Sequence, residues 1–129
     1  MTRDQFQQLI VDDPILARAV GNAVGAGRKA QFGGVTEAAV VVLMFPIVQF
    51  VLGKIGLPWL HELRRFSELQ RRRVHDWIDG EHRKHGFDPD EAEAASDALL
   101  AELEQTTDPP ARAAWERLAG LIGPKDADQ

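Results

Sequence analysis

Cysteine is absent from all 129 residues of this chain. Its absence excludes disulfide bonds, thiolate nucleophiles, and zinc or iron–sulfur sites that use cysteine ligands. A chain of 14.3 kDa is still long enough to bury a hydrophobic core. We therefore expect a single domain that is stabilised by packing alone.

Several other patterns are missing as well. No segment alternates apolar and polar residues with a period of two, so the sequence predicts an all-α fold. The glycines at 25, 27, 33 and 34 neither follow a predicted strand nor precede a Gly-Lys-Ser/Thr string, which argues against a phosphate-binding loop. The polar start of the chain, residues 1–13, predicts no cleavable targeting segment. We expect a non-catalytic protein with no cofactor and no small-molecule substrate.

The charges are unevenly distributed. The formal net charge is -5, which argues against a general polyanion binder. Residues 61–86 carry seven Arg or Lys against five acids, whereas residues 87–129 carry three bases against eleven acids. The triplet at 71–73 lies among acids and lacks interleaved aromatics, so no nucleic-acid partner is expected. The adjacent basic and acidic segments are expected to face each other in the fold.

Three Asp-Pro pairs predict helix starts. They are Asp13-Pro14, Asp88-Pro89 and Asp108-Pro109. Aspartate accepts hydrogen bonds from the first free amides of a helix, and proline fits its first position without losing a bond. Together with the glycine and Leu57-Pro58 breaks, they predict about five helices. These are residues 14–24, an apolar helix within 37–60, a long amphipathic helix at 58–85, and a C-terminal hairpin of 89–105 and 109–122, after a short turn at 4–11.

The chain divides accordingly into four parts. Residues 1–36 form a short N-terminal helical segment, 37–60 the apolar helix, 61–123 a helical bundle for protein contacts, and 124–129 a polar tail. A protein partner or a homo-oligomer is expected for the bundle.

The apolar segment predicts a membrane anchor. Residues 38–53 carry no charge in a chain that is 27% charged. Extension through Lys54 to Leu60 gives 23 residues with one charge, which is long enough to span a bilayer. Trp59 is placed as an interfacial aromatic residue, and Arg64 and Arg65 form a basic flank. The positive-inside rule then puts the C-terminal part in the cytoplasm, with the lipid bilayer as a partner.

Two alternatives to the anchor stay open. In the first, residues 38–60 form the buried core helix of a soluble, cytoplasmic interaction or oligomeric subunit. Enclosure of Val41, Phe45, Val48 and Leu52 by the chain's own helices would favour that alternative. In the second, the apolar patch within residues 15–24 pairs with the main segment as a holin-like or pore-forming hairpin, although about eleven residues are too few to span alone.

The helix expected at 58–85 carries an apolar seam. Leu63, Phe66, Val74 and Trp77 recur at helical spacing, which predicts an interaction seam along one face. His75, Asp79 and His82 also share a face, at spacings of four and three. These three residues are weak candidates for a metal site, because no His-Glu-x-x-His string is present and polar helix faces collect such residues. A solvated face is the expected role, and no metal is predicted.

Overall fold

The structure is a computed structural model that describes residues 1–27, 40–61 and 64–127. Within these ranges the chain is all-α, as predicted, and contains no strand. It has six α-helices rather than about five, together with two π-helical turns and one 3-10 turn. They are α1 (Arg3–Asp12), α2 (Pro14–Gly27), η1 (Val40–Met44), α4 (Phe45–Phe50), η2 (Val51–Ile55), η3 (Pro58–His61), α5 (Glu68–His85), α6 (Pro89–Gln105) and α7 (Pro109–Ala127).

The Asp-Pro pairs begin three of these helices, as predicted. The Asp13 carboxylate accepts from the amide N–H of Ile15 at 3.0 Å. Asp88 accepts from the Glu91 amide at 2.9 Å, and Asp108 accepts from the Ala111 amide at 3.2 Å. Each carboxylate thus satisfies an amide that the helix itself leaves free. The helix α7 continues to Ala127, past the position where a polar tail was expected.

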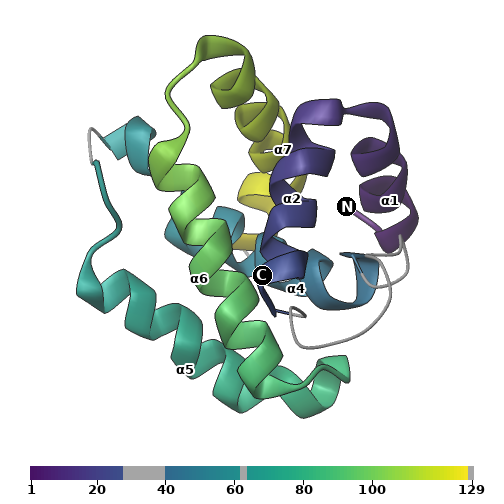
Figure 1. Ribbon diagram of the computed structural model, residues 1–129, viewed down its shortest axis with the longest axis vertical. Coiled ribbons are helices and arrows are strands. Elements are labelled where there is room, and N and C mark those ends of the chain that lie inside the picture. The colour runs from purple at the N-terminus through teal and green to yellow at the C-terminus, as the bar shows by residue number, and fades with distance from the viewer. Residues whose placement is uncertain (28–39, 62–63, 128–129) are drawn as a thin grey trace.

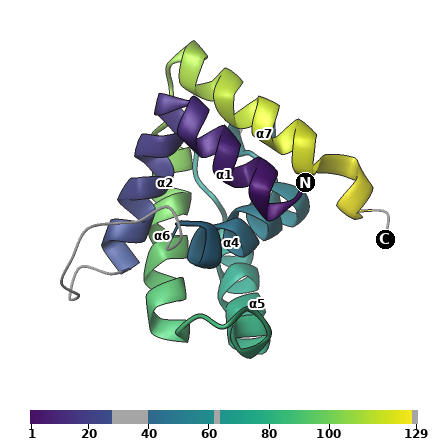
Figure 2. The ribbon, with the colours of Figure 1, turned by 90° about the vertical axis from the view of Figure 1, so that its right-hand side faces the viewer.

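The helices pack around the central apolar segment. The helix α2 lies along α6, and this is the largest helix–helix contact in the described part of the chain (Figure 1). The helix α1 packs on α2, and α7 contacts α2 and η2 and runs alongside α1 (Figure 2). The helix α5 lies at the edge of the molecule, with α6 as its main neighbour.

The segment from η1 to η2 forms the centre of the core. Phe45, Val48 and Leu52 are 8%, 0% and 6% exposed. They are covered by the chain's own helices, since η1 contacts α1 and α2, η2 contacts α7, and α4 contacts α6. The side chain of Val41 lies outside the described residues. By length and composition Val42–Leu60 is sufficient to cross a membrane, with a hydropathy of 1.6, yet 61% of it is buried inside the molecule.

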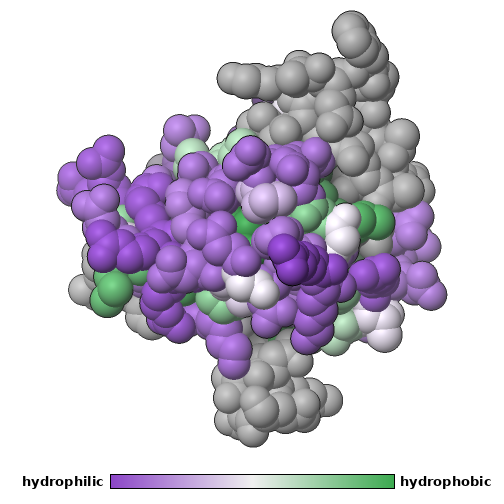
Figure 3. Space-filling view, turned by 90° about the horizontal axis from the view of Figure 1, so that it is seen from below, coloured by the Kyte–Doolittle hydropathy of each residue, from purple (hydrophilic) through white to green (hydrophobic). Residues whose placement is uncertain are grey.

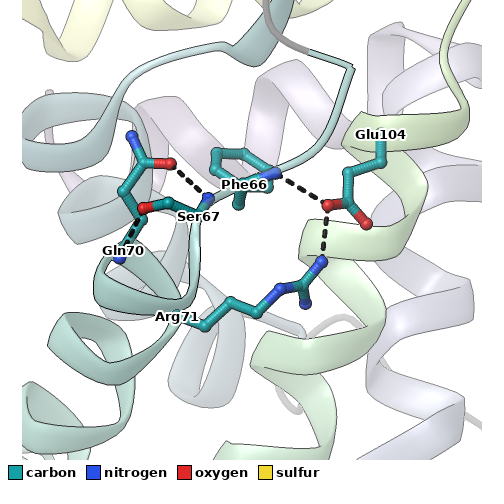
Figure 4. Close-up of polar contacts among 5 residues, drawn as sticks. All are labelled: Phe66, Ser67, Gln70, Arg71 and Glu104. Carbon is teal, nitrogen blue, oxygen red and sulfur yellow. Dashed lines mark hydrogen bonds and ion pairs between the residues drawn. The ribbon is translucent and has the colours of Figure 1, made fainter.

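The predicted helix at 58–85 is not continuous. The turn η3 covers Pro58–His61, and α5 begins only at Glu68. Ser67 caps α5 by accepting from the Gln70 amide at 3.1 Å, while the Gln70 side chain accepts from the Ser67 amide at 2.8 Å. This reciprocal capping box fixes the helix start (Figure 4).

A carboxylate on α6 holds the start of α5. One oxygen of Glu104 accepts from the Phe66 amide at 2.8 Å and also pairs with the guanidinium of Arg71 (Figure 4). Further along the two helices, His75 contacts Asp97. The expected opposition of basic and acidic helices is therefore confirmed for α5 and α6.

Candidate interaction site

Four aromatic rings meet where α4 approaches the end of α5. The rings of Phe50 and Trp77 stack with centroids 4.8 Å apart and planes inclined by 12°. Trp77 also contacts His85 at 5.5 Å, and His85 stacks on Phe87 at 5.7 Å. We call Phe50, Trp77, His85 and Phe87 the aromatic cluster. Its rings come from segments that are far apart in the sequence.

A glycine turn places the last ring of the aromatic cluster. Gly86 ends α5 with φ 75° and ψ 23°, a left-handed conformation that glycine adopts without a Cβ clash. The amides of Gly86 and Phe87 both donate to the His82 carbonyl, at 2.8 and 3.2 Å. The chain therefore folds back, and Phe87 packs against the final turns of α5.

A groove of about 240 Å³ opens beside the aromatic cluster. It is lined by Pro46, Gln49, Phe50, Gly53, Lys54, Trp77 and His85. The five lining residues between positions 46 and 54 recur at helical spacing along α4 and η2, so they form one face of the central segment. Phe50 and Trp77 are only half-buried. The volume is below the roughly 300–1,000 Å³ of small-molecule sites, and it suits a single large apolar side chain.

The histidine of the aromatic cluster has a shifted pKa. Burial lowers the pKa of His85 below its ordinary value, because the apolar surroundings disfavour the charged ring. The negative charge of Glu81 opposes this effect, while the positive charges of Lys84 and Arg3 add to it. The groove is therefore lined by an imidazole whose charged form is disfavoured and by the cationic Lys54.

The opposite side of α5 presents a wider, charged groove. Its volume is about 720 Å³, and it is lined by Glu68, Arg71, Arg72, His75, Asp76, Asp79, Glu93 and Asp97. In this groove the Nε2 atom of His75 lies 2.7 Å from Asp97, and its Nδ1 atom lies 3.5 Å from Glu93. Burial and the charge of Asp79 raise the pKa of Glu93, and His75 opposes this shift. The groove lies between α5 and α6, and His75 on α5 is already paired with two acids of α6 in it.

The weak metal candidates are not brought together as a ligand set. In the described part of the chain, no three His, Asp or Glu side chains lie close enough to hold a metal ion. His75 is directed to the acids of α6, and Asp79 contacts Glu93.

The predicted seam lies mostly inside the molecule. Phe66 and Val74 are buried, and Trp77 is half-buried in the aromatic cluster. Leu63 lies outside the described residues. The inner side of α5 is thus covered by the chain itself, and a role of the seam in binding a partner remains a prediction.

The residues predicted at a membrane interface lie near the end of the central segment. The indole N–H of Trp59 donates to Glu116 at 2.9 Å, and the Arg112 guanidinium lies 5.2 Å from the centre of its ring. Arg64 and Arg65 are exposed. Trp59 therefore has partners on α7, and the proposed contact of these three residues with lipid remains a prediction.

Sequence reasoning missed two members of the aromatic cluster. The sequence predictions include Phe50 only as part of the apolar segment, and they assign no role to Phe87. One signal was available for Phe87, because an apolar residue directly after a helix-ending glycine commonly packs back on that helix. No comparable signal pairs Phe50 with Trp77.

Comparison with known proteins gave no match to a family model, a curated protein or a solved structure. The function is therefore argued from the geometry of this chain.

Proposed function

We propose that the protein is a water-soluble, non-catalytic interaction module. In this proposal the segment from Val40 to Ile55 is a core element, and the groove beside the aromatic cluster receives a large apolar side chain from a partner protein.

The enclosure of the central segment carries the proposal. Ile47, Val48 and Val51 are fully buried, and the central segment as a whole contacts α1, α2, α6 and α7. Moving this segment into lipid would uncover the faces of four helices that now pack against it. Each large apolar side chain that returned to water would cost about 1.5–3 kcal/mol. The face on which α5 lies is hydrophilic over most of its described surface, with only small hydrophobic patches (Figure 3), which also supports an aqueous setting.

The half-covered rings support the choice of groove. Aromatic side chains supply much of the binding energy at protein interfaces when they are partly accessible and surrounded by polar residues. Phe50 and Trp77 meet this description, with Gln49 and Lys54 beside them. A bulky apolar residue next to acidic residues matches such a groove.

The first test measures the location of the full-length chain. After high-speed centrifugation without detergent, we expect the protein in the supernatant, and we expect it not to float with vesicles of mixed neutral and anionic lipids. A chain that pellets without detergent and floats with vesicles would contradict the proposal.

The second test measures binding in the groove. Peptides selected by the full-length protein from a displayed library are expected to share a large apolar residue flanked by acids. The change Gln49→Trp fills the groove and should weaken binding at least tenfold, whereas the control Gln105→Trp, on α6, should not. Equal binding by both variants would place the partner elsewhere.

A membrane anchor is the second candidate function, favoured by the length and hydropathy of Val42–Leu60. That candidate puts the C-terminal bundle in the cytoplasm. It predicts vesicle flotation and protease protection of the central segment. Leakage of a trapped dye from the same vesicles would instead support a pore-forming hairpin.

A further inference from the structure

The outer face of α5 carries a short stripe with no partner in the fold. Leu69, Arg73, Asp76 and Gly80 follow one another at spacings of four, three and four, so they line up along one side of the helix. We call these four residues the outer stripe. All four are exposed, and Leu69 is 67% exposed. Figure 3 views the molecule from below, the side on which α5 lies.

The glycine of the outer stripe is not required by the fold. Glycine inside a helix is less favourable than alanine because it has more backbone freedom to lose. Gly80 does not have a positive φ angle, in contrast to Gly56 and Gly86. A Cβ atom at position 80 would also meet nothing within 4 Å. A glycine within a helix, such as Gly80, does allow another backbone or side chain to approach the helix closely.

The charges of the outer stripe also lack partners. Neither Arg73 nor Asp76 forms a hydrogen bond or an ion pair with another described residue. By contrast, Arg71 and His75 on the α6 side of the same helix are paired with Glu104 and Asp97.

The outer stripe is complementary to itself in an antiparallel arrangement. When two α5 helices are related by a two-fold axis that brings Leu69 opposite Gly80, the same register brings Arg73 opposite Asp76. Leu69 then fills the space that the missing side chain of Gly80 leaves, twice per pair, and two ion pairs form between these contacts. On the flank, Arg72 comes within about half a turn of Asp79 of the second copy.

We propose that the protein forms a two-fold symmetric dimer through the outer stripe of α5. A second copy fits this surface better than a polyanion or an anionic lipid surface does, because Arg and Asp are interleaved along the outer stripe. One helix per copy gives an interface below about 1,200 Å² in total, so the dimer is a weak and reversible one. This dimer goes beyond the binding groove of the proposed function, and both can operate together because the groove lies on another side of α5.

The test compares molar mass by sedimentation equilibrium across protein concentrations from about 10 µM to about 1 mM. The wild type is expected to shift from monomer to dimer. Each single change Arg73→Asp and Asp76→Arg should weaken the dimer at least tenfold, because it puts like charges opposite each other. The double variant R73D/D76R should restore it, because the swapped pair is again complementary.

Two further variants separate the contact from the fold. Leu69→Glu should abolish the dimer, whereas the control Leu121→Glu, at a leucine that is 58% exposed, should not. Gly80→Ala should raise the melting temperature of the monomer and yet weaken the dimer, a pair of opposite effects that a purely structural glycine would not produce.

Each outcome bears on the proposal. A wild type that stays monomeric throughout, or a dimer that persists in the Leu69→Glu and Arg73→Asp variants, would overturn it. A chain that pellets without detergent would overturn the proposed function separately. The charge-swap series would then be read in detergent solution, where loss and restoration of the dimer would still support the α5 contact.

Discussion

At the scale of single residues, a few polar contacts set the position of α5. Glu104 accepts from the Phe66 amide and pairs with Arg71, so one carboxylate of α6 fixes both the approach to α5 and its first turn. Such a half-buried, charge-assisted contact contributes more than an exposed ion pair. At the other end, the left-handed turn at Gly86 returns Phe87 to the helix. The groove between α4 and α5 thus depends on contacts at both ends of α5.

The pH dependence of stability tests the environment of His85. Its pKa is lowered in the folded state by burial. Its contribution to stability is therefore complete above the unfolded pKa of about 6.5 and is lost as the pH falls through that value, because the folded state resists protonation. We compare the wild type with His85→Gln by urea unfolding at pH 7.5 and pH 5.5, about one unit either side of that value. On this drop in pH, the free energy of unfolding should fall more for the wild type than for His85→Gln.

The same series with His82→Gln serves as a control on the same helix. A wild type that became more stable relative to His85→Gln at the lower pH would contradict the assigned environment. It would mean that the neighbouring Glu81 charge, and not burial, dominates at His85.

At the scale of elements, the helix starts differ in how far they could be predicted. The Asp-Pro pairs combine a capping carboxylate with a preset φ, and all three were placed correctly. The start of α5 was missed because apolar residues keep a helical spacing from Trp59 to Trp77. Ser67 and Gln70 form a capping box that contradicts this spacing, and the local hydrogen bonds prevail.

The π-helical turns of the central segment could not be predicted. Apolar periodicity does not distinguish a π-helical turn from an α-helical one, and both η1 and η2 are made of residues that favour burial. The same ambiguity left the role of the segment open. Hydropathy measures only the free-energy cost of exposing apolar side chains to water. Burial in a lipid bilayer and burial in a protein core both remove that cost, so hydropathy does not distinguish them.

Truncation of a central side chain tests whether protein surrounds this segment. Ile47 is fully buried, so Ile47→Ala should destabilise the detergent-free protein by about 2–5 kcal/mol through lost burial and a residual cavity. Val42 is 42% exposed, and Val42→Ala should change stability by less than about 0.5 kcal/mol. Urea unfolding measures both. Equal, small effects would indicate that Ile47 is not in a packed protein core.

At the scale of the whole molecule, the binding groove arises from tertiary structure. Its floor comes from residues 46–54 and its wall from residues 77 and 85, which sequence patterns treat as separate segments. The apolar spacing predicts the seam on α5, but its coverage by the chain itself depends on how the described helices meet. The sequence predicted the all-α class but not this binding groove, because no residue pattern specifies a surface that is assembled from distant segments.

Deletion of the first two helices tests the architecture as a unit. Phe6, Leu16 and Val20 are almost fully buried against the rest of the core. Removal of residues 1–27 would expose the matching faces of α6 and of the central segment, so we expect the remaining chain to lose its cooperative thermal transition, followed by circular dichroism. Val20→Asp should have a similar effect, and Val11→Asp, at a valine that is 55% exposed, should leave the transition intact. A membrane-anchored arrangement with an independent bundle at 61–123 predicts the opposite result, namely that the truncated chain keeps the wild-type transition.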